Sequence, residues 1–228
     1  MLAASSAHAD ISATVTGISD YDFRGVSQTA DDPALQGSID FEADTGFYAG
    51  VWASNVDFDD CCGEDYEIDY YAGWVAGDAL EWDFGAVYYA YPGANDLNYP
   101  EIYGGATYYG GEDTWDLGAK LWASWDWFGY DAYGYYSEIN GNYALPWWGI
   151  GVTAHVGYTF GDGPDEFTFD SGLREYVDWW LGINRSFGPV DLELRYVDTD
   201  LGEGLEVSGD AGTNDDRFIF SVSTTFPW

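Results

Sequence analysis

The stretch WGIGVTAHVGYTF, residues 148–160, alternates between two kinds of side chain. The residues between the apolar ones are small or polar and include His155. A period of two predicts a β-strand, because successive strand residues point to opposite faces. The stretch is long enough for a tilted strand to cross a bilayer, with one face toward lipid and the other toward water. The expected lipid-facing set is Trp148, Ile150, Val152, Ala154, Val156, Tyr158 and Phe160.

The same alternation recurs from Asp10 onward in segments of about ten residues. Short Gly/Asp turns at 43–46, 76–79, 110–113 and 187–189 alternate with longer acidic loops at 26–33, 57–65, 92–100, 127–131, 161–172 and 201–216. This rhythm predicts an all-β fold, a transmembrane antiparallel up-and-down β-barrel of about twelve strands, with short periplasmic turns and long acidic extracellular loops. Pro146 would interrupt a central strand, so we expect it to mark a turn. The strands are expected at 11–24, 34–43, 46–56, 66–76, 80–91, 101–109, 114–125, 132–145, 148–160, 176–187, 190–197 and 217–228.

Composition supports a barrel and excludes two other classes. Aromatic residues make up 20% of the chain and glycine contributes 30 residues, unlike the mixture typical of helical proteins. The sequence contains no apolar run long enough for a transmembrane helix. With 41 acidic and 6 basic residues, the net charge of −35 excludes nucleic-acid binding. Rings such as Trp82 and Trp125 near segment ends are expected at the lipid interfaces.

Both ends of the chain carry patterns of export and assembly. Ala7-His8-Ala9 matches the small-x-small pattern before a signal-peptidase cut. We therefore expect residues 1–9 to be the remnant of a signal peptide and residues 10–228 to form the barrel; a loose polar N-terminus is the alternative. At the other end, an alternating strand stops on the aromatic Trp228, as in the closing strand read by the barrel-assembly machinery.

Several stretches together resemble one protein family. They are DYDFRGVSQT (20–29), DPALQGS (32–38), GFYAGVWASNV (46–56), EIDYYAG (67–73), YAYPG (89–93) and VDTD (197–200). In these the chain is similar to the TorF family of porins, a proteobacterial outer-membrane family of unknown function. The resemblance implies a barrel in the outer membrane of a Gram-negative bacterium with a role as a pore. It implies no catalytic residues.

The residues give no support for an enzyme. His155 is the single histidine of the expected mature chain, and no Gly-x-Ser-x-Gly element supplies a nucleophile for it. One histidine and two adjacent cysteines do not match the spacing of a zinc site. We therefore interpret His155 as a polar residue of the lumen and expect no cofactor.

Two loops carry candidate sites. Cys61 and Cys62 are adjacent, and in an oxidising compartment they are expected to form a vicinal disulfide; an intermolecular bridge and free thiols are the alternatives. The acids of the later loop are weak candidates for Ca²⁺, without the spacing of an EF-hand, so a solvated acidic loop is the simpler interpretation. They are Asp162, Asp165, Glu166 and Asp170.

The alternation of side chains between the two faces of each strand also predicts which charged residues line the pore. In this inward set acids outnumber bases, which would concentrate cations and repel anions in a narrow lumen. The set is Asp20, Asp22, Arg24, Asp40, Glu42, Glu67, Asp69, Glu81, Asp83, Asp116, Lys120, His155, Asp191, Glu193, Arg195 and Arg217.

The main functional hypothesis is therefore an outer-membrane porin for passive, cation-favouring diffusion of ions or small solutes. The alternative is a non-conducting structural barrel whose acidic loops bind divalent cations and mediate assembly. A soluble acidic β-sandwich or lipocalin-like binder is a third reading. The expected partners are outer-membrane lipid and lipopolysaccharide, the barrel-assembly machinery through the C-terminal strand, and further copies of the chain in a homo-oligomer.

Overall fold

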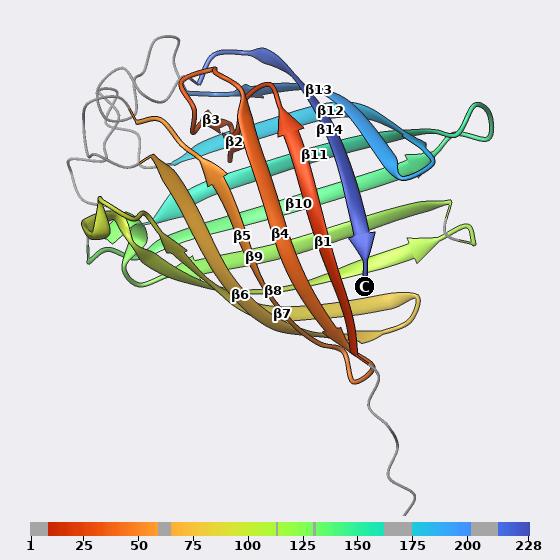
Figure 1. Ribbon diagram of the computed structural model, residues 1–228, viewed down its shortest axis with the longest axis horizontal. Coiled ribbons are helices and arrows are strands. Elements are labelled where there is room, and N and C mark those ends of the chain that lie inside the picture. The colour runs from red at the N-terminus through yellow and green to blue at the C-terminus, as the bar shows by residue number, and fades with distance from the viewer. Residues whose placement is uncertain (1–8, 59–64, 113, 130, 162–174, 202–213) are drawn as a thin grey trace, which may run out of the picture.

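The computed structural model describes residues 9–58, 65–112, 114–129, 131–161, 175–201 and 214–228. They form a closed barrel of twelve antiparallel strands in sequence order, sealed where β1 pairs with β14 (Figure 1). The wall strands are β1 (Ala9–Ile18), β4 (Ala34–Ala43), β5 (Phe47–Asn55), β6 (Tyr66–Gly77), β7 (Leu80–Ala90), β8 (Tyr99–Gly110), β9 (Trp115–Ser124), β10 (Gly134–Ala144), β11 (Ile150–Gly161), β12 (Tyr176–Phe187), β13 (Val190–Thr199) and β14 (Arg217–Pro227). The predicted fold class is confirmed.

The connections at the two ends of the barrel differ as the sequence predicts. Short turns join β4 to β5 and β6 to β7 at the end where β1 begins and β14 ends, and long connections occupy the opposite end (Figure 1). Pro146 lies in the turn between β10 and β11, which is closed by the amide of Leu145 donating to Ile150 O at 2.8 Å. Within the described ranges, the long connections contain the short 3₁₀ helices Asn95–Leu97 and Trp127–Gly129.

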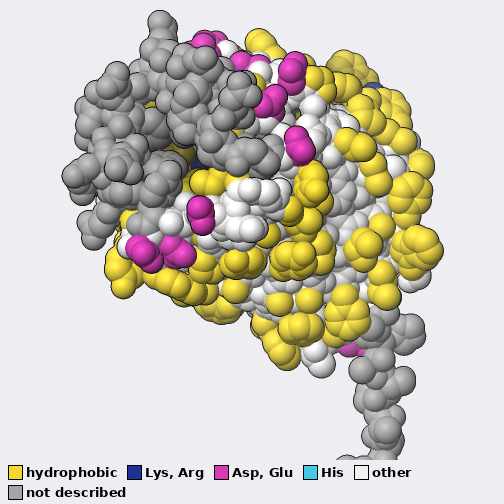
Figure 2. Space-filling model, turned by 60° about the vertical axis from the view of Figure 1, so that its left-hand side comes forward, with side chains coloured by type: hydrophobic (Ala, Val, Ile, Leu, Met, Phe, Trp, Pro, Cys, Tyr) yellow, Lys and Arg dark blue, Asp and Glu magenta, His cyan; other side chains and the backbone are white. Residues whose placement is uncertain are grey.

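The outer wall is apolar, because apolar residues occupy alternate positions on each strand and these positions all face outward. Phe84 on β7 is 56% exposed and Phe218 on β14 is 70% exposed. Hydrophobic side chains cover the barrel surface in Figure 2, while the acidic side chains in that view gather toward the long-loop end. Such a surface is stable in hydrocarbon, where a closed barrel satisfies its backbone hydrogen bonds within its own wall. No helix in the described ranges is long and apolar enough to cross a membrane.

The largest departure from the sequence prediction lies after β1. The predicted strand runs to residue 24, but β1 ends at Ile18 and the chain turns away from the wall. It forms a small hairpin from β2 (Asp22–Phe23) and β3 (Val26–Ser27), so Asp20, Asp22 and Arg24 do not belong to a wall strand. The turn requires positive φ at Arg24 (53°) and Gly25 (84°), which strand parity does not reveal.

Candidate functional site

The hairpin crosses the lumen and is bound by ion pairs to opposite walls. Arg217 on β14 donates from Nη2 to Asp22 Oδ1 at 2.6 Å and from Nε to Asp20. Arg24 at the turn donates to both oxygens of Glu101 on β8, at 3.0 and 2.6 Å. β14 and β8 lie half-way round the barrel from each other. Two arginines therefore bind one short segment to both sides of the lumen.

Aromatic rings and a glycine fit the hairpin to the wall. Tyr21 meets the ring of Trp52 with centroids 5.2 Å apart, and Phe23 meets Tyr89 at 5.9 Å. The Arg24 guanidinium lies 4.2 Å from the centroid of the Tyr136 ring. A Cβ on Gly25 would come within 2.2 Å of Thr199 Cγ2, so only glycine allows this approach to β13. The long-loop end of the lumen is thus filled by a packed segment.

Burial and neighbouring charges shift the pKa values of two side chains of the hairpin, Asp22 and Arg24. Desolvation raises the pKa of Asp22, against the opposing charges of Arg217 and Arg195. Burial alone would lower the pKa of Arg24, but the Glu101 carboxylate more than offsets it, and the pKa is raised. Arg24 is therefore always charged, and Asp22 binds its proton more tightly than an exposed aspartate does.

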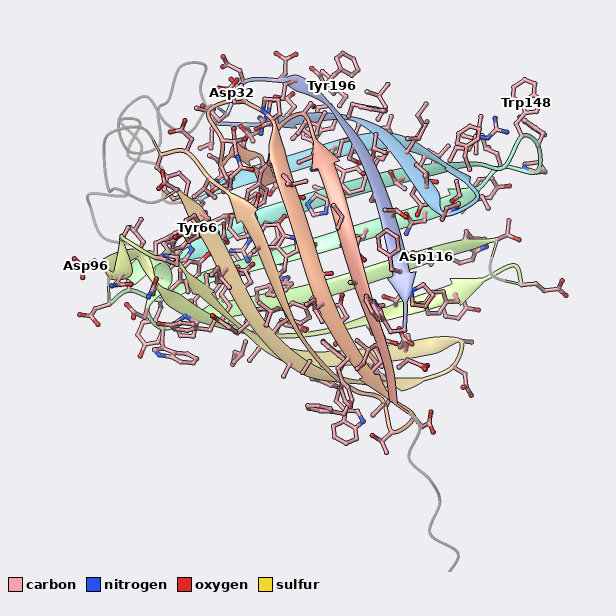
Figure 3. All side chains as sticks on the ribbon, in the orientation of Figure 1. Asp32, Tyr66, Asp96, Asp116, Trp148 and Tyr196 are labelled. Atoms are coloured by element: carbon pink, nitrogen blue, oxygen red, sulfur yellow. The ribbon has the colours of Figure 1, made fainter. Side chains whose placement is uncertain are left out.

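The lumen is hollow toward the short-turn end. A cavity of about 610 Å³ is lined there by the rings of Tyr48, Tyr71, Tyr103 and Trp122 and by the charges of Glu42, Glu81, Asp83 and Lys120. A smaller cavity of about 380 Å³ lies at β12–β14, where the inward side chains of Asn184, Ser186, Asp191, Glu193, Ser221 and Ser223 are all polar. Figure 3 shows the side chains on the ribbon; its labelled Asp116 lies toward the short-turn end.

His155 belongs to a hydrogen-bonded group on the lumenal wall. Its Nε2 lies 2.8 Å from Tyr136 Oη and 3.0 Å from Asp178 Oδ1, and its Nδ1 lies 2.7 Å from Asn140 Oδ1. The imidazole stacks on Trp180 at 5.6 Å. Since Tyr136 also contacts Arg24, this group supports the hairpin. These contacts place His155 on the lumenal wall, next to the hairpin.

The remaining predicted lumenal residues are spread over the wall. Asp40 accepts from Tyr71, Asp116 accepts from Asn142 at 2.7 Å, and Arg195 lies over Trp180. Asp191 and Glu193 border the smaller cavity, and Asp69 shares its strand and face with Glu67, which is 1% exposed. Three groups thus come together: the hairpin with Arg217, the cavity with Lys120, and the polar surface at β12–β14.

In the part of the chain that the structure describes, the lumenal acids Glu101, Glu138 and Asp178 were not among those predicted from the sequence. The signal for them was the same parity, because Glu101 shares its face with Tyr103, and Asp178 lies between the outward Val177 and Trp179. The predicted pair Cys61 and Cys62 lies outside the described residues, as do the candidate Ca²⁺ ligands Asp162, Asp165, Glu166 and Asp170. Within the described ranges, no group of three or more His, Cys, Asp or Glu is arranged to hold a metal ion.

Comparison with known proteins identifies a family and a fold. The family described as "Bacterial protein of unknown function (Gcw_chp)" matches residues 2–226. No curated protein matches the chain. Among solved structures, the NanC porin superposes with a TM-score of 0.62 at 8% identity, covering 94% of this chain and 98% of that one. The KdgM porin gives 0.59 at 9% identity, covering 94% and 99%, and KdgM in complex with disordered oligogalacturonate gives 0.55 at 10% identity, covering 95% and 99%. The shared fold, together with the apolar outer wall, places this chain in the bacterial outer membrane.

Proposed function

We propose, from the premise that the chain belongs to the Gcw_chp family of bacterial proteins of unknown function, that it is an outer-membrane porin for passive, cation-favouring diffusion of ions or small solutes. The fold it shares with porins supports a channel rather than an enzyme. Four further points stay predictions. They are membership of the TorF family, contact with lipopolysaccharide, formation of a homo-oligomer, and a role for the C-terminal strand in assembly.

The observation that carries the cation preference is the balance of charge around the larger cavity. Glu42, Glu81 and Asp83 line it against the single cation of Lys120. In a narrow space bounded by low-dielectric walls, an excess of carboxylates attracts cations and repels anions. KdgM has been solved in complex with disordered oligogalacturonate, whereas for this chain we propose a preference for cations.

The test is the reversal potential in a planar bilayer under a KCl gradient. We expect discrete conductance with K⁺ favoured over Cl⁻, and we expect the Glu81→Gln, Asp83→Asn double variant to reduce that preference. Asp198→Asn, a neutralisation at a residue that shares the outer face with Trp179, serves as the matched control. Anion preference in the parent protein would contradict the proposal.

The hairpin supports the second candidate, a non-conducting structural barrel. Because it is bound to β14 and β8, it occupies the long-loop end of the lumen. A variant with residues 20–29 replaced by a Gly/Ser linker distinguishes the porin from the structural barrel. Conductance in both proteins supports the porin, conductance only without the hairpin supports a channel closed by it, and silence in both supports the structural barrel.

A further inference from the structure

One ammonium group is already bound within the larger cavity. Lys120 Nζ donates to Asp83 Oδ2 at 2.7 Å. The same nitrogen lies 4.5 Å from the centroid of the Tyr103 ring and 5.3 Å from that of Trp122. A carboxylate opposite two aromatic faces is the arrangement that binds alkylammonium ions in proteins.

The cavity exposes ring faces because glycines on neighbouring strands give the rings room against the wall. A Cβ on Gly73 would come within 2.3 Å of Tyr48 Oη, and one on Gly85 within 2.4 Å of Tyr103 Oη. Gly50 stands in the same relation to Tyr71. Hydrogen bonds then fix the ring edges: Tyr48 Oη donates to Asp83 Oδ1 at 2.6 Å, and Trp122 Nε1 donates to Glu138 Oε1 at 2.8 Å.

The ammonium of Lys120 does not neutralise the cavity and is accessible to water. Glu42, Glu81 and Asp83 outnumber it. The side chains of Lys120 and Asp83 are 27% and 22% exposed, so a solute can reach the pair. By contrast, the Arg24–Glu101 pair is 7% and 1% exposed and is closed to exchange.

We propose that this cavity is a binding site for small organic cations bearing an alkylammonium group, which displace Lys120 from Asp83 and occupy the position between Tyr103 and Trp122. This inference rests on the proposed function, since it names the class of cation that the lumen favours. Glu42 and Glu81 line the same cavity, and their carboxylates compensate the displaced ammonium. The aromatic faces favour an alkylammonium over K⁺, because K⁺ loses more hydration on binding there.

Lys120 is the only lysine of the sequence, which makes the test direct. Reductive methylation with carbon-13 formaldehyde labels its amine and the N-terminal amine while preserving the positive charge. In detergent micelles, the rings should shift the methyl resonance of Lys120 upfield. Titration with butylammonium chloride should move it back, whereas equal concentrations of KCl, butanol or sodium butyrate should not.

Variants identify the groups that bind the ligand. In the Asp83→Asn variant, the methyl resonance of Lys120 should lie near the position of a methyl group that no ring shifts, and butylammonium should no longer move it. The Asp191→Asn variant, at the smaller cavity, should change neither the position of the resonance nor its response to butylammonium. Tyr103→Leu should weaken butylammonium binding about tenfold, from the loss of one cation–π contact. Resistance to SDS until heating shows that each variant is folded.

The outcomes separate the site from the porin hypothesis. A titrating resonance in a protein without conductance supports the site and contradicts the porin. Cation-selective conductance with a resonance that butylammonium does not move overturns the site and leaves the porin. Equal displacement by butanol would show a site for neutral solutes and would also overturn the inference.

Discussion

At the scale of single residues, Gly25 and Asp22 determine how the hairpin fits the lumen. Gly25 combines a left-handed backbone with a close approach to Thr199 and Asp178. Asp22 is buried against Arg217 and close to other charges, those of Arg195, Asp20 and Asp178. Each residue leads to a separate experiment.

Gly25→Ala should displace the hairpin, because its Cβ would clash with Thr199 in addition to the strain of positive φ. Gly188→Ala is a matched control: it also has positive φ (64°), but no atom lies within 4 Å of its added Cβ. Hydrogen exchange of amides in residues 20–29 should accelerate in G25A and stay unchanged in G188A. Equal protection in both variants would contradict the close packing.

The raised pKa of Asp22 gives a pH dependence with a defined sign. The docked hairpin binds this proton more tightly than the released hairpin does, so the contribution of Asp22 to docking is present at acid pH. It is lost as the pH rises through the raised pKa. Exchange protection, corrected for intrinsic rates, should therefore fall with rising pH, and Asp22→Asn should flatten that slope. A slope that survives in D22N would assign the effect to another group.

At the scale of elements, the hairpin depends on the buried Arg24–Glu101 pair. Removing one member of such a pair leaves an uncompensated charge and costs about 3–5 kcal/mol. Glu101→Gln should therefore release the hairpin while the barrel stays closed. Rapid hydrogen exchange of the hairpin amides, with protection retained in β8, would show that the hairpin is released from an intact barrel. The control Asp116→Asn, at an exposed hydrogen-bonded pair, should leave the exchange of both segments unchanged.

The wall strands could be predicted from the sequence, but the hairpin could not. Lipid on one side and water on the other impose a period of two on the whole wall, and β4 and β12 have the predicted bounds. Residues 19–24 continue that alternation, and contacts with residues far away in the sequence, among them Glu101 and Arg217, direct them into the lumen. The cavity was missed for the same reason: carboxylates and rings from β4 to β9 meet there only after the barrel closes.

At the scale of the whole molecule, adjacent positions on one strand should differ sharply in tolerance to charge. Ala106 and Thr107 are consecutive on β8, with Ala106 on the outer face and Thr107 on the inner one. Ala106→Arg should destabilise the barrel by about 2–4 kcal/mol if it lies near the bilayer midplane, and Thr107→Arg should cost much less. Urea unfolding in lipid vesicles measures both, and an equal cost would contradict the assignment of the two faces.

The bond between Arg217 and Asp20 joins residues 197 positions apart. Arg217 belongs to the last strand of the barrel wall, and Asp20 follows the first. The hairpin therefore has its complete binding surface only after β14 has paired with β1 and the cylinder is sealed. A barrel still open at the seam consequently lacks the Arg217 half of the contacts that hold the hairpin inside the wall.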